Sequence, residues 1–290
     1  NKPLVIMFIP VAVYFVLFKY VPMLGIVIAF KEYNMADGIW GSPWVGLDNY
    51  RYLFGNPQMG SVIRNTLVLS VLNVLVGFPF PIALAILLNE VKKMWFKRWV
   101  QTLVYLPHFL NWVIVGGLIV MVFAQETGAI NALLKRLTGD VYPFLYEKGS
   151  WLAIYVGSTI WKGAGWAAIV YLAALTAIDT SLYEAADIDG ASKWRKIWHV
   201  TLPGIRTVIV LMFVLNIGNV MEVGFDQVFV LQNALVVDIS EVISTWNFKY
   251  GIGTGEFSYG TAFGLFESAI GLILVLAANA IARKFDQGLW

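Results

Sequence analysis

The sequence predicts an all-α protein that crosses a membrane six times. Hydrophobic residues make up 59% of the 290 residues, and charged residues only 13%. A soluble domain carries about 25% charged residues, so this chain has too little polar surface to be covered by water alone. Six apolar stretches are each long enough to cross a bilayer as a helix, which takes about 20 residues.

The predicted spans are separated by polar connections along the whole chain. They lie at residues 3–30, 65–89, 100–124, 151–178, 205–231 and 261–282. Several contain proline or glycine, which membrane helices tolerate because neighbouring groups satisfy the freed backbone. No linker or low-complexity tract divides the sequence, so we predict one transmembrane domain over residues 1–290.

The distribution of basic residues predicts the orientation of the chain. Cytoplasmic loops of membrane proteins are enriched in Lys and Arg. With both termini inside, the inner segments (1–2, 90–99, 179–206 and 283–290) hold 11 Lys and Arg in 48 residues, and the outer segments (31–64, 125–150 and 234–260) hold seven in 87. This asymmetry predicts cytoplasmic termini and a cytoplasmic loop at 179–206.

That inner loop contains the polar stretch SLYEAADIDGASKWRKIWHVTLP, which starts at Ser181. Ser181 and Glu184 have the spacing of a capping box, in which each side chain pairs with a backbone N–H of the other residue. Asp179 and Thr180 are alternative caps. The pattern predicts a short helix over residues 182–189.

A second short helix is predicted directly afterwards. Gly190 suits the left-handed position that ends a helix, and Ser192 can cap a helix over residues 193–200. Pro203 is expected to end that helix, because proline has no backbone N–H. The sequence thus encodes two short helices with a sharp bend between them.

The two helices differ in surface chemistry. The first carries the carboxylates of Glu184, Asp187 and Asp189 together with small alanines that allow close approach of another surface. The second is basic and aromatic, with residues such as Trp194 and Arg195. That composition is expected for a segment that lies at lipid headgroups.

The order of residues in this loop resembles a known motif. Glu184-Ala185-Ala186, three residues, Gly190, nine residues and then Val200-x-Leu202-Pro203 resemble the EAA loop of permease subunits in binding-protein-dependent ABC importers. The segments WVGLDNYRYLF (44–54), RNT (64–66) and GFDQVFVL (224–231) look like those of sugar permeases. QNAL (232–235) replaces the Gly-Gly-Pro of many monosaccharide and disaccharide permeases. With FSYGTAFGLF (257–266), it is more similar to the branch that imports larger saccharides, including the alginate importer.

The resemblance implies a type I ABC importer-like fold in the bacterial inner membrane. It also implies partners: a second homologous permease subunit, two ATPase subunits that bind ATP and Mg, an extracytoplasmic binding protein, membrane lipid, and a saccharide that moves by alternating access. In this family, Glu184 would pair with a basic group of the ATPase, Ala185 and Ala186 would pack closely against it, and Gly190 would form the turn. Leu202 and Pro203 would anchor the loop to the fifth span.

Catalytic, metal and cofactor sites are not predicted within this chain. A phosphate-binding loop needs Gly-Lys in G-x-x-x-x-G-K-[ST], and the sequence contains no Gly-Lys pair. There is no cysteine, and His108 and His199 are too far apart in sequence to suggest a metal motif. The net charge of +2 gives no indication of a nucleic-acid partner. We therefore predict a transport subunit rather than an enzyme.

Polar residues within spans predict a substrate path, because they are costly in lipid and usually face a cavity. The fifth span carries four of them at a spacing of three, three and four residues, which is one face of a helix. These four are Asn216, Asn219, Glu222 and Asp226. Further candidates in other spans are Lys162, Trp161, Asn111, Asn73 and Glu267. Carboxylates on this path would repel an acidic saccharide, and Lys162 is placed to offset them.

Other interpretations of these polar residues remain open. They can join helices to one another without touching a substrate, and His108 fits helix packing better than a proton relay. A stand-alone proton-coupled secondary transporter would use Glu222, Asp226 and Glu267 as its relay, but it leaves the capped cytoplasmic helices without a purpose. A membrane scaffold without transport leaves the polar face of the fifth span without one.

Overall fold

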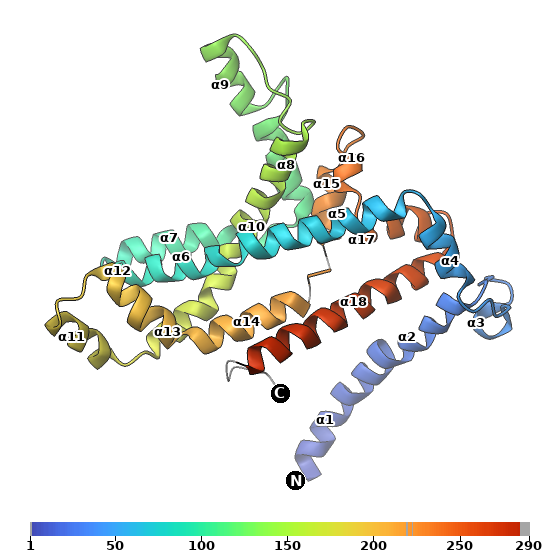
Figure 1. The fold of residues 1–290 in the computed structure, drawn as a ribbon, viewed down its shortest axis with the longest axis horizontal. Helices are drawn as coiled ribbons and strands as arrows, with labels where there is room; N and C mark the ends of the chain where they lie inside the picture. Colours follow the sequence, from blue (N-terminus) through green and yellow to red (C-terminus); the bar gives the residue numbers. More distant parts are fainter. Residues whose placement is uncertain (1, 219, 222, 285–290) are drawn as a thin grey trace. The chain divides into compact units, whose positions relative to one another are not determined.

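A computed structural model of the chain describes residues 2–218, 220–221 and 223–284 (Figure 1). The regular elements in this described part are all helical, and its only β-bridge is an isolated pair, Lys31 and Trp44. Three helical stretches are long and apolar enough to cross a membrane: Pro3–Phe30, Met59–Glu90 and Phe257–Arg283. Three strongly bent helix pairs bring the number of candidate spans to six. The predicted all-α, six-span fold class is confirmed, while the cytoplasmic placement of the termini stays a prediction.

The contacts divide the chain into two units, residues 1–64 with 241–270 and residues 65–240 with 271–290. The division by itself leaves the single-domain prediction open. Two long helices, α5 (Met59–Leu72) and α18 (Phe257–Arg283), contribute residues to both units. The other helices of the first unit are α1 (Lys2–Phe15), η1 (Val16–Tyr20), α2 (Val21–Met23), η2 (Leu24–Phe30), α3 (Gly38–Gly41), α4 (Asp48–Gly55), α17 (Ile243–Trp246) and η6 (Asn247–Ile252).

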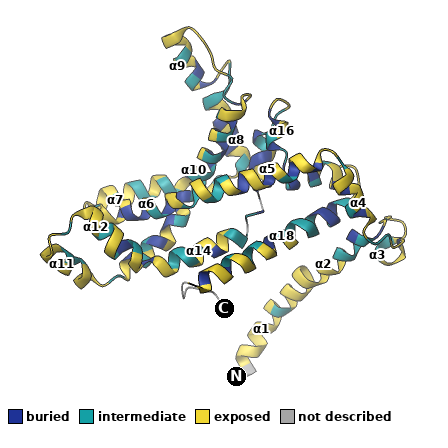
Figure 2. Cartoon of the chain, in the orientation of Figure 1, coloured by how far each residue is buried: buried dark blue, intermediate teal, exposed yellow. Residues whose placement is uncertain are grey.

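Within the first unit, buried polar contacts tie the loop after η2 to its neighbours. The Asn49 side-chain amide donates to the backbone oxygens of Ala29, at 2.9 Å, and Lys31, at 3.0 Å. The α1 helix, in contrast, is exposed along its length (Figure 2). Its side chains are almost all apolar, so its exposed surface suits lipid rather than water.

The second unit contains the remaining helices. They are η3 (Asn73–Gly77), α6 (Pro79–Glu90), α7 (Met94–Tyr105), η4 (Leu106–Phe109), α8 (Trp112–Phe123), α9 (Ala129–Thr138), α10 (Lys148–Thr176), α11 (Thr180–Ile188), α12 (Lys193–Lys196), η5 (Ile197–Thr201), α13 (Leu202–Gly204), α14 (Arg206–Gly218), α15 (Phe225–Leu231) and α16 (Val237–Ser240). The long α10 packs along α6, and the buried side chains of Ala85, Ala168, Tyr171 and Ile205 form a core between α6, α10 and α14.

Two predicted spans are interrupted in the structure. The third is broken at Leu110–Asn111, where the 94–109 and 112–123 helices meet at 109°. Pro107 lies in the short η4 turn before the break, and the Asn111 side chain accepts a hydrogen bond from the Ile114 N–H to cap α8. In the predicted fifth span, α14 ends at Gly218 and α15 begins at Phe225.

The polar loop forms the two predicted short helices, but the start of the first and the end of the second differ from the prediction. Asp179 caps α11 by accepting from the Ser181 N–H at 2.9 Å, so an alternative cap replaces the predicted Ser181–Glu184 box. Gly190 has a φ of +68° and Ser192 caps α12, both as predicted. Pro203 does not end the second helix. Helical structure continues through the π turn of η5 to Gly204, and Pro203 lies in the first turn of α13, a position that proline tolerates. The chain then bends by 64° before α14.

Candidate coupling surface and membrane cavity

The α11 helix presents a surface suited to contact with another chain. The side chain of Ile188 is 87% exposed, and Leu182 is exposed on the same short helix. Glu184 and Ala185 are also exposed, while Ala186 is half-buried. No ion pair of Glu184 occurs within the described part of the chain. The exposed Glu184 carboxylate and the exposed side chains of Leu182 and Ile188 are thus accessible to another chain.

The cap of α11 also fixes the charge of Asp179. The backbone N–H of Ser181 donates to its carboxylate, which lowers the pKa of Asp179 below its usual value. This residue is therefore ionised at neutral pH. A negative charge at a helix N-terminus is stabilising, because the exposed backbone N–H groups carry partial positive charge.

Side-chain contacts brace α11 against the second short helix. Lys196 forms an ion pair with Asp187, and the Tyr183 and Thr201 hydroxyls lie 3.0 Å apart. Thr201 is buried and belongs to the π turn that precedes Pro203. These contacts tie the exposed helix to the element that leads into the fifth span.

The same element packs into the helix core below it. Ile197 and Leu202 lie against the core of α6, α10 and α14. A Cβ at Gly204 would approach the Ile178 side chain to 2.8 Å, which leaves no room between α13 and the end of α10. Of the two predicted anchors, Leu202 is half-buried in this core, whereas Pro203 is exposed. A displacement of α11 would therefore reach the spans through packed side chains.

A polar cavity of about 290 Å³ lies among the same spans. It brings together two predicted path residues, Asn73 of η3 and Asn216 of α14. Asn73 donates to the Tyr155 hydroxyl at 2.9 Å, while its oxygen and the Ser70 hydroxyl are buried without a partner among the described residues. Buried polar atoms without a partner are costly, so the Asn73 oxygen and the Ser70 hydroxyl would gain from a polar partner if a movement of the helices exposed them to the cavity.

Some polar residues of the cavity are not among those predicted from the sequence. Ser70 lines it from α5 and Thr159 from α10. The Thr159 hydroxyl donates to the Gln227 side-chain oxygen at 2.9 Å, and Gln227 donates to the Tyr155 backbone oxygen. Single serines and threonines are common in membrane helices, where they bond to their own backbone, so they carried no signal. The π-helical η3 segment is typical of functional sites but was not visible in the sequence.

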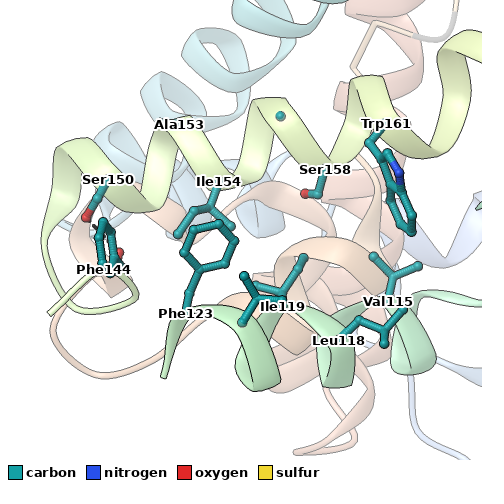
Figure 3. A pocket seen from close by; sticks show the side chains of 12 residues that line it. Val115, Leu118, Ile119, Phe123, Phe144, Ser150, Ala153, Ile154, Ser158 and Trp161 are labelled. Carbon is teal, nitrogen blue, oxygen red and sulfur yellow. Dashed lines mark hydrogen bonds between the residues drawn. The ribbon is translucent and has the colours of Figure 1, made fainter. Parts of the chain in front are cut away.

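Three other predicted path residues lie elsewhere. Trp161 lines an apolar groove of about 620 Å³ between α8 and α10, with its ring directed toward α8 (Figure 3). Lys162 donates to the His108 backbone oxygen at 3.0 Å and lies 5.4 Å from the Trp112 ring. Asn111 caps α8. Lys162 and Asn111 thus support the break in the third span, and none of the three is among the residues that line the polar cavity.

The predicted polar face of the fifth span is not one helix face. Asn216 lies near the end of α14 and Asp226 in the first turn of the separate helix α15. Asn219 and Glu222 lie outside the described residues. The prediction of one continuous helix face is wrong, because the helix stops at Gly218. Glu267 lies on α18 in the part that belongs to the first unit, and its role on the path stays a prediction.

His108 packs against an aromatic ring. Its imidazole stacks on Trp166 with 4.5 Å between ring centres and an angle of 3° between planes. This contact favours the packing interpretation of His108 over the proton relay. Within residues 2–218, 220–221 and 223–284, no group of three or more His, Cys, Asp or Glu side chains could hold a metal ion.

Residues 77–290 match the family described as the inner membrane component of binding-protein-dependent transport systems. The chain belongs to this family. It is 47% identical over 287 residues to the polygalacturonan/rhamnogalacturonan transport system permease protein YteP of Bacillus subtilis (strain 168), which covers 99% of this chain and 89% of that protein. Protein LplB of the same organism is 44% identical over 287 residues, which is 99% of this chain and 90% of LplB.

Solved structures resemble the chain over almost its full length. A bacterial ABC transporter involved in the import of the acidic polysaccharide alginate matches with a TM-score of 0.90 and 39% identity, over 98% of this chain and 96% of that chain. The alginate transporter in complex with an alginate pentasaccharide-bound periplasmic protein matches with a TM-score of 0.91 and 38% identity, over 99% and 96%.

The family and the fold together identify the role of this chain. It is a membrane-spanning permease subunit of an ABC importer and resides in the inner membrane. The resemblance to permease subunits of binding-protein-dependent ABC importers is confirmed. The comparisons give no support to the stand-alone proton-coupled transporter.

Proposed function

We propose that this permease subunit passes an acidic oligosaccharide or polysaccharide across the inner membrane by alternating access. The polar cavity forms part of the path, with Asn73 and Asn216 as hydrogen-bonding contacts for sugar hydroxyls. The α11 helix couples the path to a separate ATPase.

One observation carries this proposal: the coupling loop and the cavity share a core. Tyr171 and Met212 line the polar cavity, and both also belong to the core against which Ile197 and Leu202 pack. Because close-packed interiors transmit displacement rather than absorb it, a shift of α11 changes the walls of the cavity. This arrangement supports a rocking motion of the spans driven from the loop.

The substrate class rests on the relatives and on one cation. YteP is named for the transport of polygalacturonan/rhamnogalacturonan and the structural relative for the import of alginate, which are polymers that contain acidic sugars, while a less similar relative, at 29% identity, is named for arabinooligosaccharides. Lys162 forms no ion pair with any carboxylate of the described residues, so its charge is available to an acidic saccharide that passes the break in the third span. The cavity is at the small end of ligand sites, which are about 300–1,000 Å³, and it suits one sugar ring of a chain that moves through.

The ATPase contact uses the residues of the EAA-type loop. Glu184 pairs with a basic group of the ATPase, and Ala185 and Ala186 allow its surface to approach closely. Gly190 sets the angle between the two short helices. ATP and Mg bind to the ATPase subunits, because this chain has no Gly-Lys pair with which to build a phosphate-binding loop.

The complete importer contains further chains. A second, homologous permease subunit closes the path, two ATPase subunits dock inside, and an extracytoplasmic binding protein delivers the saccharide. The structural relative in complex with a saccharide-bound periplasmic protein supports this arrangement. Asn219, Glu222, Asp226 and Glu267 remain proposed path residues.

The test is ATP hydrolysis by the complex purified from its own membranes and placed in lipid nanodiscs. We expect hydrolysis to rise when binding protein loaded with an oligogalacturonide is added, and not with a neutral glucan. Asn73→Ala and Asn216→Ala should reduce saccharide transport severalfold, whereas Thr138→Ala on the exposed α9 should not. A complex without an ATPase, or cavity variants that transport at the normal rate, would contradict the proposal.

A further inference from the structure

Basic and aromatic side chains gather where α6 ends. The residues just before and within α7, together with those of α12 and η5, alternate lysine or arginine with tryptophan. We define the basic–aromatic belt as Lys92, Lys93, Trp95, Arg98, Trp99, Lys193, Trp194, Arg195 and Trp198. The function proposed above assigns no binding partner to this belt.

Two contacts place both halves of the belt at the same end of α6. The Lys193 ammonium lies 3.9 Å from the carboxylate of Glu90, the last residue of α6. Ile197, between the two tryptophans of the second half, packs against the core that contains Ile86. The first half follows Glu90 directly in the chain. Because the 59–90 stretch is a candidate span, the belt lies at a membrane–water boundary.

The aromatic part of the belt is unusually exposed. The four tryptophans are each between 64% and 73% exposed, although an indole ring is among the side chains that gain most from burial. Tryptophan is enriched at membrane interfaces, where its ring meets acyl chains and its N–H meets headgroups. The exposure therefore indicates a lipid environment.

The charged part of the belt has little internal compensation. In the described part of the chain, the side chains of Lys92, Lys93, Arg98 and Arg195 form no ion pair. Lys193 contacts the carboxylate of Glu90, and Lys196, next to Arg195, pairs with Asp187 of α11. Uncompensated cations beside interfacial tryptophans fit a headgroup with net negative charge better than a zwitterionic one.

The neighbouring α11 helix has the opposite charge. Its exposed Glu184 and the adjoining Asp189 would be repelled by an anionic membrane surface, whereas the belt would be attracted to it. The two short helices are thus divided in chemistry, with the acidic one suited to a protein partner and the basic one to lipid. This division argues against the ATPase as the occupant of the belt.

We propose that the basic–aromatic belt binds anionic phospholipid headgroups of the surrounding bilayer. Lysine and arginine side chains donate to phosphate oxygens, and the tryptophan rings lie at the level of the headgroups. A lipid held by both halves ties α12 to the start of α7 and steadies the base of the coupling loop. Coupling between ATP hydrolysis and transport then depends on anionic lipid.

The test uses tryptophan fluorescence of the intact complex in phosphatidylcholine vesicles. One lipid in five is replaced with a brominated lipid, either phosphatidylglycerol or phosphatidylcholine, because bromine quenches nearby tryptophans. We expect stronger quenching by the brominated phosphatidylglycerol. The ratio of affinities for phosphatidylglycerol and phosphatidylcholine, taken from this quenching, should fall in Lys93→Gln/Arg98→Gln by about fivefold for each charge removed. The reason is that a basic residue near an anionic surface contributes about 1 kcal/mol.

Matched variants separate the belt from general surface charge. Lys135→Gln/Arg136→Gln removes two exposed cations from α9 and should leave the preference unchanged. Replacement of the four belt tryptophans with phenylalanine should remove the excess quenching by phosphatidylglycerol, with assembly checked by co-purification of the partner subunits. Equal quenching by the two brominated lipids, or an equal loss of preference in the α9 control, would overturn the proposal. Retention of the excess without the belt tryptophans would overturn it as well.

Discussion

Gly190 carries the strictest single-residue requirement in the coupling loop. Its φ of +68° is a left-handed conformation, which costs a residue with a Cβ about 1–2 kcal/mol. No atom lies within 4 Å of the position that a Cβ would take there, so backbone strain alone is at issue. We expect Gly190→Ala to reduce saccharide-stimulated ATP hydrolysis severalfold and Gly190→Asn to reduce it less, because asparagine tolerates this conformation.

A helical glycine provides the control for this experiment. Gly60 on α5 also has open space where a Cβ would lie, but its φ is not positive. Gly60→Ala should leave hydrolysis unchanged, because alanine favours a helix over glycine. Equal losses in the Gly190 and Gly60 variants would contradict a role for the turn.

The cap of α11 predicts a pH dependence. The pKa of Asp179 is lowered in the folded chain by the Ser181 N–H, so its carboxylate stabilises α11 above its ordinary pKa, and this stabilisation is lost as the pH falls through the lowered value. Coupled hydrolysis should therefore not change through this group between about pH 5 and 8. Asp179→Ala should weaken coupling throughout that range, while Asp179→Asn, another good cap, should retain most of it.

Single residues were predicted best where local chemistry alone decides. Gly190 and Ser192 follow from turn and cap preferences that act within a few residues. The choice of Asp179 over Ser181 as the cap was left open, because adjacent polar residues compete for the same N–H groups. The cavity positions of Ser70 and Thr159 depend on which helices pack together, which no local pattern encodes.

Among the helices, α7 and α10 approach each other closely at Gly165. A Cβ at Gly165 of α10 would lie 1.9 Å from the Val104 backbone oxygen of α7. Backbone cannot move aside as a flexible side chain does, so Gly165→Ala should destabilise the complex by about 1–3 kcal/mol or more. Thermal unfolding in detergent measures this loss.

Gly157 on the same helix gives the matched comparison. No atom lies within 4 Å of the position that its Cβ would take, so Gly157→Ala should unfold at the wild-type temperature or above it. A similar decrease in both variants would show that the contact of α7 with α10 is not responsible.

The breaks within the helices are the part of the spans that could not be predicted from the sequence. Hydropathy locates apolar stretches well, because burial in lipid requires them, and the spans at 3–30 and 261–282 match helical segments closely. Hydropathy does not register a bend. Leu110–Asn111 and the end of α14 at Gly218 lie within apolar stretches, so the predicted helix face from Asn216 to Asp226 assumed a continuity that the chain does not have.

At the scale of the whole molecule, the family could be predicted from the order and spacing of residues in one short loop, because such a pattern over some twenty residues is far more specific than any single residue in it. The polar cavity could be predicted only in part. Asn73 and Asn216 come from spans that are far apart in sequence, and their meeting depends on the packing of α10 against its neighbours.

The charge of Lys162 gives a whole-molecule prediction about substrate class. Lys162→Met should reduce transport of an acidic oligosaccharide severalfold more than transport of a neutral one, because the attraction for carboxylates is lost. Lys162→Arg keeps the charge and should retain the preference. Uptake into vesicles that contain the complete complex measures it, and equal losses for both saccharides would assign Lys162 to the support of the third span alone.

The most direct measurement of coupling is a cross-link from α11. The chain contains no cysteine, so Ala185→Cys introduces a unique thiol at the exposed centre of this helix. A short cross-linker with one thiol-reactive end and one amine-reactive end should join this cysteine to a lysine of the ATPase in a complex that hydrolyses ATP in response to saccharide. Leu137→Cys on the exposed α9 should give no such product. Absence of the product at Ala185→Cys in an active complex, or an equal yield at Leu137→Cys, would contradict docking of the ATPase on α11.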